Sequence, residues 1–124
     1  MIGDLTDLAT LRSVLRCFGM QPTKKLSQNF LVDRDVLEAI VDAADLAPQS
    51  YVLEVGAGTG VLTRELVQRA GFVVAVEVDT RATPLLQEVI GEAKNITLLT
   101  ADVMRLSPEQ LSEAFGQAPG KPFR

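Results

Sequence analysis

The amino-acid sequence predicts an α/β fold built on a parallel sheet. Three short apolar runs, at 51–55, 72–76 and 96–100, have the composition of strands that are buried on both faces. Each run is followed by a segment whose apolar residues recur at helical spacing. Strands that alternate with helices in this way pair in parallel through right-handed crossovers, which place the strands side by side with helices on both faces of the sheet.

The first predicted strand leads directly into a turn with alternating glycines. The run 51–55 contains one charged residue, Glu54, and it is followed by Gly56, Gly58 and Gly60. Backbone without Cβ atoms lets a ligand approach closely. A dinucleotide fingerprint needs its third glycine one place later, where Val61 stands. The spacing Glu-x-Gly-x-Gly-x-Gly instead resembles the first motif of class I methyltransferases, which bind S-adenosylmethionine. The alternative is a tight turn without a ligand.

Two helices are expected before the first strand. One covers 5–18, with Asp4 or Thr6 as its N-cap, and the other covers 34–44, with Asp33 as its N-cap. The apolar residues of the second helix are expected to face the core: Val36, Leu37, Ile40, Val41 and Ala44.

Three further helices are expected over 61–70, 80–90 and 107–115. Gly71 is the expected left-handed cap of the first of them. A capping box with a proline at the first helical position starts the last one at Ser107.

Composition excludes several classes of function. The chain has 124 residues, of which 47% are hydrophobic and 23% charged, so one globular domain is expected. With Cys17 as the only cysteine and no histidine, a disulfide framework and a zinc cluster are excluded, and we expect no metal. The N-terminus lacks the pattern of a signal peptide, and no apolar run approaches the ~20 residues that span a bilayer. We therefore expect a cytoplasmic protein without membrane association.

The charge of the chain is unevenly distributed. The net charge is −4, which is the wrong sign for general attraction to nucleic acid. Basic residues nevertheless gather in the first third of the sequence, so a local basic face is compatible with an acidic total. They are Arg12, Arg16, Lys24, Lys25 and Arg34.

Acidic residues stand at the ends of all three predicted strands: Glu54, Glu77 and Asp102. In open parallel sheets the ligand crevice lies outside these carboxyl ends. Glu77, ~20 residues beyond the glycines, can accept hydrogen bonds from both ribose hydroxyls of an adenosine cofactor. Asp102 can accept one from the exocyclic amine of adenine, and Val78 and Val103 are placed to sandwich the ring. The alternative for each acid is a solvated loop residue.

The charge at these strand ends favours one adenosine cofactor over another. NAD needs a helix N-terminus for its pyrophosphate, which Glu54, Asp79 and Asp102 would repel. S-adenosylmethionine carries a sulfonium and an ammonium group, which acidic surroundings tolerate. The sequence therefore predicts binding of the methyl donor.

Several motifs together resemble one family. They are KKLSQNFL at 24–31, LEVGAGTG at 53–60, VEVD at 76–79 and AD at 101–102. In this order they resemble the ribosomal RNA small-subunit adenine N6,N6-dimethyltransferases, which are related to the erythromycin-resistance methylases and to mitochondrial relatives that serve in transcription. The sequence QNFL before the glycines is the distinguishing signature, and the resemblance runs from about residue 11 to residue 106.

The resemblance implies a set of cofactor-binding residues. Asn29 and Leu31 contact the methionine end of the cofactor, and Gly56 lies against it. Glu77 binds the ribose and Asp102 the adenine, as the residues themselves suggest. Ser27 departs from the glycine that many relatives have at its position.

The resemblance also implies a reaction. The exocyclic N6 amine of an adenine in small-subunit ribosomal RNA, or in a precursor of that subunit, attacks the methyl group of the cofactor, twice in succession. The catalytic motif of the family, Asn-Leu-Pro-Tyr, would come just after Arg124, so no catalytic residue is expected within this chain. Catalysis would consist of positioning and electrostatics.

We expect a single domain in two parts. Residues 1–32 form an N-terminal helix and a cofactor-covering loop, and 33–124 form part of a Rossmann-like S-adenosylmethionine-binding domain, truncated after the third strand–helix unit. Three alternatives stay open: a methyltransferase-like nucleic-acid-binding or transcription-factor relative, a class I methyltransferase with another substrate, and, last, a nicotinamide oxidoreductase. The sequence makes no prediction about the oligomeric state.

Overall fold

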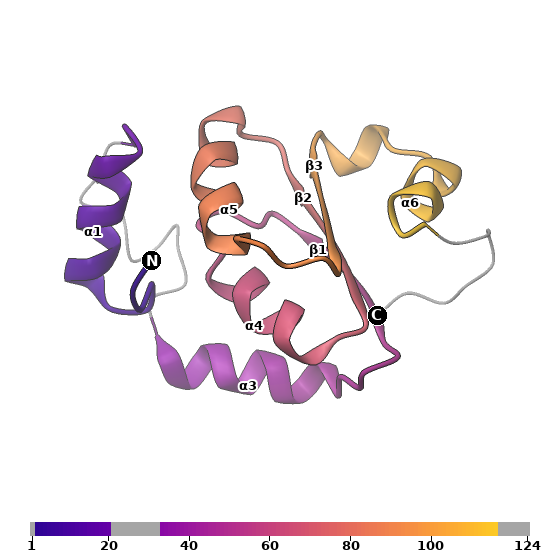
Figure 1. Cartoon of the computed structure of the whole chain (residues 1–124), viewed down its shortest axis with the longest axis horizontal. Helices are drawn as coiled ribbons and strands as arrows, with labels where there is room; N and C mark the ends of the chain where they lie inside the picture. Colours follow the sequence, from indigo (N-terminus) through magenta and orange to yellow (C-terminus); the bar gives the residue numbers. More distant parts are fainter. Residues whose placement is uncertain (1, 21–32, 117–124) are drawn as a thin grey trace.

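A computed structural model describes residues 2–20 and 33–116 of the chain (Figure 1). Its elements follow in the order α1 (Leu8–Cys17), α3 (Arg34–Ala44), β1 (Tyr51–Val55), α4 (Val61–Arg69), β2 (Phe72–Glu77), the 3-10 helix η1 (Thr80–Ala82), α5 (Thr83–Ile90), β3 (Ile96–Thr100), the 3-10 helix η2 (Val103–Arg105) and α6 (Pro108–Ala114). None of the described helices is both long enough and apolar enough to cross a membrane.

The described residues form one parallel sheet of three strands in the order β1-β2-β3. Leu53 of β1 lies beside Val74 of β2, and Val76 of β2 lies beside Leu99 of β3. The three predicted strands and their parallel pairing are therefore confirmed. All three strands end at the same edge, so the glycine turn after β1 and the acidic residues after β2 and β3 lie at that edge.

Helices cover both faces of the sheet, with α4 and α5 on one side and α6 on the other (Figure 1). Val52 and Val73 pack with Leu66 of α4 on the first side. On the second side, Val74 and Phe115 belong to one buried cluster, and the Phe115 ring also lies against Tyr51 and Phe72. Because successive residues of a strand point to opposite faces, a strand that is covered twice needs an uninterrupted apolar run.

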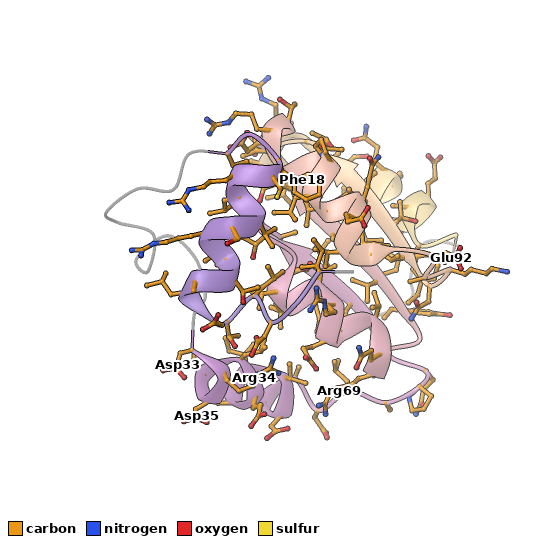
Figure 2. The ribbon with its side chains drawn as sticks, turned by 60° about the vertical axis from the view of Figure 1, so that its left-hand side comes forward. Phe18, Asp33, Arg34, Asp35, Arg69 and Glu92 are labelled. Atoms are coloured by element: carbon orange, nitrogen blue, oxygen red, sulfur yellow. The ribbon has the colours of Figure 1, made fainter. Side chains whose placement is uncertain are left out.

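The two N-terminal helices pack on the outside of the α4 and α5 layer. Leu11 and Leu15 of α1 share a buried cluster with Leu37 of α3 and Leu85 of α5. Phe18, just after α1, is packed against the same cluster (Figure 2).

The core-facing surface of α3 is narrower than predicted. Leu37 and Val41 are buried, but Val36 and Ile40 are 45% and 41% exposed. The prediction for these two was wrong because α3 packs on its neighbours along a single i, i+4 stripe. Leu37 and Val41 form this stripe, and the residues directly before them, Val36 and Ile40, face solvent.

The helix termini confirm some predictions and correct others. Asp33 caps α3 as predicted, with its carboxylate accepting from the backbone N–H of Asp35 and of Val36. The cap of the first helix is Asp7, so the prediction of Asp4 or Thr6 was wrong. Asp4 instead accepts hydrogen bonds from the backbone and the hydroxyl of Thr6, which forms a turn ahead of the helix.

Two later termini also differ from expectation. Gly71 is not left-handed, because α4 ends at the extended C-cap Ala70. A Cβ at Gly71 would lie 2.4 Å from the carbonyl oxygen of Pro48, so glycine is needed here for close backbone approach. The expected helix over 80–90 is divided into η1 and α5, with Pro84 in the first turn of α5. The capping box at Ser107 is present as predicted.

Candidate cofactor site at the carboxyl ends of the strands

The glycine turn crosses the end of β2. Gly56, Gly58 and Gly60 have φ angles of 79°, 58° and 84°, in the left-handed region that favours glycine. The backbone N–H groups of Gly56 and Ala57 both donate to the carbonyl oxygen of Val76, at 2.8 and 3.2 Å. The turn is therefore held against the neighbouring strand by backbone hydrogen bonds.

The outer glycines of the turn have different surroundings. A Cβ at Gly60 would lie 2.9 Å from Cγ1 of Val89, so this glycine allows the start of α4 to pack against α5. A Cβ at Gly56 would meet no atom within 4 Å. The turn is therefore closely packed where α4 begins and open beside Gly56, and the open side is where a ligand can reach the backbone.

Glu77 connects the glycine turn to the segment after β2. Its Oε1 accepts a hydrogen bond from the backbone N–H of Gly58 at 2.7 Å, and its Oε2 accepts one from Asp79 at 2.9 Å. The side chain is buried. Each oxygen keeps further acceptor capacity, so the carboxylate is fixed in orientation and is still able to accept from a ligand.

Val78 and Asp79 follow Glu77 and differ in their surroundings. The Val78 side chain is 66% exposed, which is unusual for a residue next to a buried strand. Asp79 caps η1 and pairs with the guanidinium of Arg81 at 2.8 Å. The hydrogen bond from the Arg81 side chain is the main cause that lowers the pKa of Asp79 to about 2. Because Arg81 pairs with this carboxylate, Asp79 repels anions less than the sequence predicts.

Asp102 stands at the corresponding position after β3. Its carboxylate accepts from the backbone N–H of Met104 at 3.0 Å and so caps η2. The preceding residue, Ala101, donates its backbone N–H to the carbonyl oxygen of Glu77 at 3.0 Å, which ties the ends of β2 and β3 together. Val103 packs partly into the cluster below α6, whereas Met104 is 87% exposed. Met104 is therefore an exposed apolar side chain at this edge that sequence reasoning missed.

Glu54 is the most deeply buried acid at this edge, with 7% of its surface exposed. The hydroxyl of Thr63, in the first turn of α4, donates a hydrogen bond to its Oε1. Burial is the main cause that raises the pKa of Glu54 to about 7, the Glu77 carboxylate raises it further, and the Thr63 hydrogen bond opposes the rise. The prediction that Glu54 repels anions as a negative charge therefore needs correction, because near pH 7 part of the carboxyl groups are protonated. The position of Glu54 inside the apolar run 51–55 is the feature of the sequence that indicates its burial.

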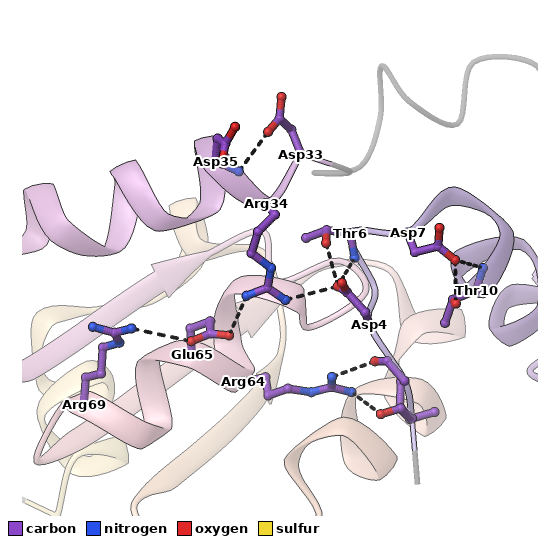
Figure 3. A network of polar contacts seen from close by, with 12 residues as sticks. Asp4, Thr6, Asp7, Thr10, Asp33, Arg34, Asp35, Arg64, Glu65 and Arg69 are labelled. Atoms are coloured by element: carbon purple, nitrogen blue, oxygen red, sulfur yellow. Dashed lines mark hydrogen bonds and ion pairs between the residues drawn. The ribbon is translucent and has the colours of Figure 1, made fainter.

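The N-terminal segment is tied to α3 and α4 by arginines (Figure 3). The Arg34 guanidinium binds Asp4 at 3.1 Å and Glu65 at 3.3 Å. Arg64 donates to the carbonyl oxygens of Gly3 and Ile2 at 2.7 and 3.1 Å. These contacts fix the elements on either side of residues 21–32.

The predicted site residues divide into two groups. Gly56, Glu77 and Asp102 all lie at the carboxyl edge of the sheet, joined through the Gly58 turn and the Ala101 hydrogen bond. Asn29 and Leu31 lie outside the described residues.

Comparison with known proteins decides the family. The sequence profile described as "Ribosomal RNA adenine dimethylase" matches residues 19–123. The chain belongs to the ribosomal RNA adenine dimethylase family. The resemblance inferred from the four motifs is therefore confirmed.

Two relatives, one from each of two organisms, have the same sequence identity to this chain. A ribosomal RNA small subunit methyltransferase A from Pelotomaculum thermopropionicum is 40% identical over 121 residues, covering 94% of this chain and 41% of the relative. A probable methyltransferase of the same name from Methanopyrus kandleri is also 40% identical and covers 90% of this chain and 40% of the relative. The chain thus spans about two fifths of the length of these relatives.

Solved structures agree with the fold. The 23S rRNA methyltransferase ErmE superposes with a TM-score of 0.57 and 39% identity, over 61% of this chain and 31% of that one. A dimethyladenosine transferase from Plasmodium falciparum gives the same TM-score at 26% identity, over 60% of this chain and 28% of that one. The Rossmann-like methyltransferase sheet predicted from the sequence is confirmed by these similarities.

Proposed function

We propose that this chain is the cofactor-binding part of an S-adenosylmethionine-dependent enzyme that dimethylates the N6 amine of adenine in small-subunit ribosomal RNA. Membership of the ribosomal RNA adenine dimethylase family supports the substrate class. The observation that carries cofactor binding is the orientation of Glu77, whose two oxygens are fixed by Gly58 and Asp79 beside the open face of Gly56. A ribosomal RNA substrate also suits the cytoplasmic location expected from the sequence.

The described residues suit this cofactor. Glu77 would accept hydrogen bonds from the ribose hydroxyls, and Asp102, as an exposed carboxylate after β3, would accept one from the adenine amine. Val78, which directly follows Glu77, offers an exposed apolar surface for the ring. The space beside Gly56 lets the methionine part approach the backbone, and we assign Asn29 and Leu31 to that part by the family resemblance.

The roles of the chain are binding and orientation. When bound, S-adenosylmethionine supplies a methyl group on a positively charged sulfur. The ribose contact at Glu77 and the adenine contact at Asp102 would hold that group at a fixed place relative to the sheet. We assign no catalytic residue to this chain, because the family motif that orients the target amine, Asn-Leu-Pro-Tyr, does not occur among its 124 residues. The loop that follows the helix in residues 1–32 would cover the cofactor, and 33–124 would hold it.

The test is transfer of a labelled methyl group from S-adenosylmethionine to unmodified small ribosomal subunits. A protein extended through the region that relatives have beyond this chain is expected to methylate N6 of adenine, and this chain alone is not. Loss of positioning removes ~7–11 kcal/mol of barrier lowering, so a residual rate would be undetectable. Methylation by the chain alone at a rate near that of the extended protein would contradict the assignment. An extended protein that binds the subunit without methylation would favour the nucleic-acid-binding alternative.

A further inference from the structure

We propose that the exposed side of α1, which carries Arg12 and Arg16, is a binding surface for phosphate groups of the RNA substrate. The inference rests on the proposed function, because it takes the substrate to be ribosomal RNA. It adds a surface that lies outside the cofactor contacts described above, and it gives that surface the role of holding the RNA next to the cofactor.

The helix α1 has one buried side and one basic side. Leu11 and Leu15 are buried, whereas Arg12 and Arg16 are exposed. The two arginines are four residues apart, so they lie on the same side of the helix, about 6 Å from each other along its axis. No acidic residue is present in α1 itself. The helix therefore presents two positive charges to solvent and has no acid of its own to balance them.

Within residues 2–20 and 33–116, the guanidinium groups of Arg12 and Arg16 have no carboxylate or carbonyl partner. Each of the other arginines that the structure describes has such a partner: Arg34, Arg64, Arg69, Arg81 and Arg105. Like charges one helical turn apart repel each other, so binding of an anion stabilises the pair on α1. These two arginines are thus available for an anionic partner.

The neighbouring helix α3 has the opposite charge. Asp35, Glu38 and Asp42 are exposed along it, so it repels a polyanion. By contrast, residues 8–32 contain no aspartate or glutamate. The basic residues of that stretch are Arg12, Arg16, Lys24 and Lys25. RNA that approaches this acidic chain is therefore attracted at α1 and repelled at α3.

The end of α1 adjoins the candidate cofactor site. Met20 donates its backbone N–H to the carbonyl oxygen of Leu15 at 2.8 Å, which holds it beside the last turn of α1. The Met20 side chain packs against a cluster that includes Ala57 of the glycine turn and Ala82 after β2. Arg16 belongs to the same last turn, so it lies near the edge of the sheet at which the methyl donor is proposed to bind.

A basic surface at this place suits the phosphates that flank the target adenine. The adenine has to leave its stack to reach a methyl group at the carboxyl edge, while the phosphates on either side of it stay outside. A guanidinium group can bind a phosphate through two parallel hydrogen bonds. Such contacts set the position of the RNA and do not read its sequence. Arg12 and Arg16 are therefore positioning residues for the substrate.

Binding of the extended protein to unmodified small ribosomal subunits, measured at several salt concentrations, tests the proposal. The double variant Arg12→Ala, Arg16→Ala should bind about tenfold more weakly at ~0.1 M salt. The slope of log affinity against log salt should become shallower by about 1.4, because each lost phosphate contact contributes ~0.7. The double variant Arg12→Lys, Arg16→Lys keeps both charges and should keep the slope. Calorimetry should show an unchanged affinity for S-adenosylmethionine in both.

The variant Arg69→Ala is the matched control. Arg69 also stands in the last turn of a helix, and its side chain is 51% exposed. It differs in its position at the end of α4 that is remote from the glycine turn, and in its partner Glu65 at 3.9 Å. Its removal should leave both the affinity for the subunit and the salt dependence unchanged.

The outcomes separate this inference from the proposed function. Unchanged affinity and slope in the double alanine variant would overturn the role of α1 and leave the proposed function intact. An equal loss in Arg69→Ala, or a loss of S-adenosylmethionine binding in the double variant, would also overturn it. Altered self-association with unchanged subunit binding would assign the surface to an acidic protein face, such as α3 of a second copy, and overturn it as well. If the extended wild-type protein neither binds nor methylates the subunit, the proposed function fails together with this inference.

Discussion

Glu54 and Glu77 are buried to a similar degree at the ends of neighbouring strands, yet their hydrogen-bond partners differ. Glu77 accepts from two backbone N–H groups, at Gly58 and Asp79, whereas Glu54 accepts from one side-chain hydroxyl, at Thr63. The comparison teaches that burial alone does not define the role of an acid at this edge. The β2 carboxylate is fixed for a ligand, and the β1 carboxylate is free to take up a proton near neutral pH.

The largest expected effect is the pH dependence of stability caused by Glu54. The folded state holds this proton more tightly than the unfolded chain, because the pKa rises from 4.5 to about 7 on folding. Below 4.5 both states are protonated, so the stability is complete there, and it is lost as pH rises through about 7. The loss should be roughly 3 kcal/mol. Urea unfolding of the ligand-free protein at about pH 5 and about pH 8 should show it in the wild type and not in Glu54→Gln. If the free energy of unfolding depended on pH equally in both proteins, Glu54 would not be the group that takes up a proton near neutral pH.

Removing the β2 carboxylate should weaken cofactor binding with little change in pH dependence. Glu77→Ala is expected to lose about 1.5–3 kcal/mol of binding free energy, the range for hydrogen bonds to a charged group. Glu92→Ala, an exposed acid beyond α5 (Figure 2), is the matched control and should bind like the wild type. Calorimetry on the two variants checks this. Equal affinities would mean that Glu77 holds the glycine turn through Gly58 and does not bind the cofactor.

A smaller effect is expected from Thr63, the donor to Glu54 among the described residues. Thr63→Val leaves the buried carboxylate without a partner and should cost about 1–2 kcal/mol of unfolding free energy at about pH 8. The loss should be smaller at about pH 5, where the carboxyl group is protonated. Thr63→Ser, measured by the same urea unfolding, should restore most of the stability. A loss that is independent of pH would mean that Thr63 acts through packing alone.

The smallest effect should come from the exposed acid Asp79, which has a local partner. Its pKa lies near 2, mainly because of the Arg81 side chain, so its contribution to stability is present above 3.8 and is lost as pH falls through about 2. Arg81→Ala should move the pKa back toward 3.8 and leave the affinity for the methyl donor unchanged. NMR titration of the carboxyl groups measures the pKa of Asp79, and calorimetry measures the affinity for the methyl donor. A pKa that stays near 2 in the variant would assign the shift to the backbone cap.

Much of the fold was predictable because its causes are local or periodic. Strands covered on both faces need continuous apolar runs, which is why β1, β2 and β3 were found with nearly correct bounds. Asp33 and Ser107 were identified as caps because the capping atoms lie within three residues. The confirmed family followed from motif order rather than from any single glycine.

Most of the errors concern contacts between residues far apart in the sequence. Periodicity shows which residues of α3 are apolar, but not that Val36 and Ile40 stay exposed beside the buried Leu37 and Val41. A glycine after a helix has the same appearance whether it adopts a left-handed angle or, like Gly71, makes room for the backbone of Pro48. The protonation of Glu54 depends on Thr63 and Glu77, which only the folded sheet brings to it. The pairing of Asp79 with Arg81 is different, because the two residues are only two positions apart and the pair could have been predicted from the sequence.

The central claim is that the carboxyl edge of this sheet binds S-adenosylmethionine. Calorimetric titration of the purified chain with S-adenosylmethionine and, separately, with NAD tests it most directly. We predict saturable binding of the methyl donor to one site, weaker than in an extended protein, and no detectable binding of NAD. Tighter binding of NAD than of S-adenosylmethionine would contradict the account.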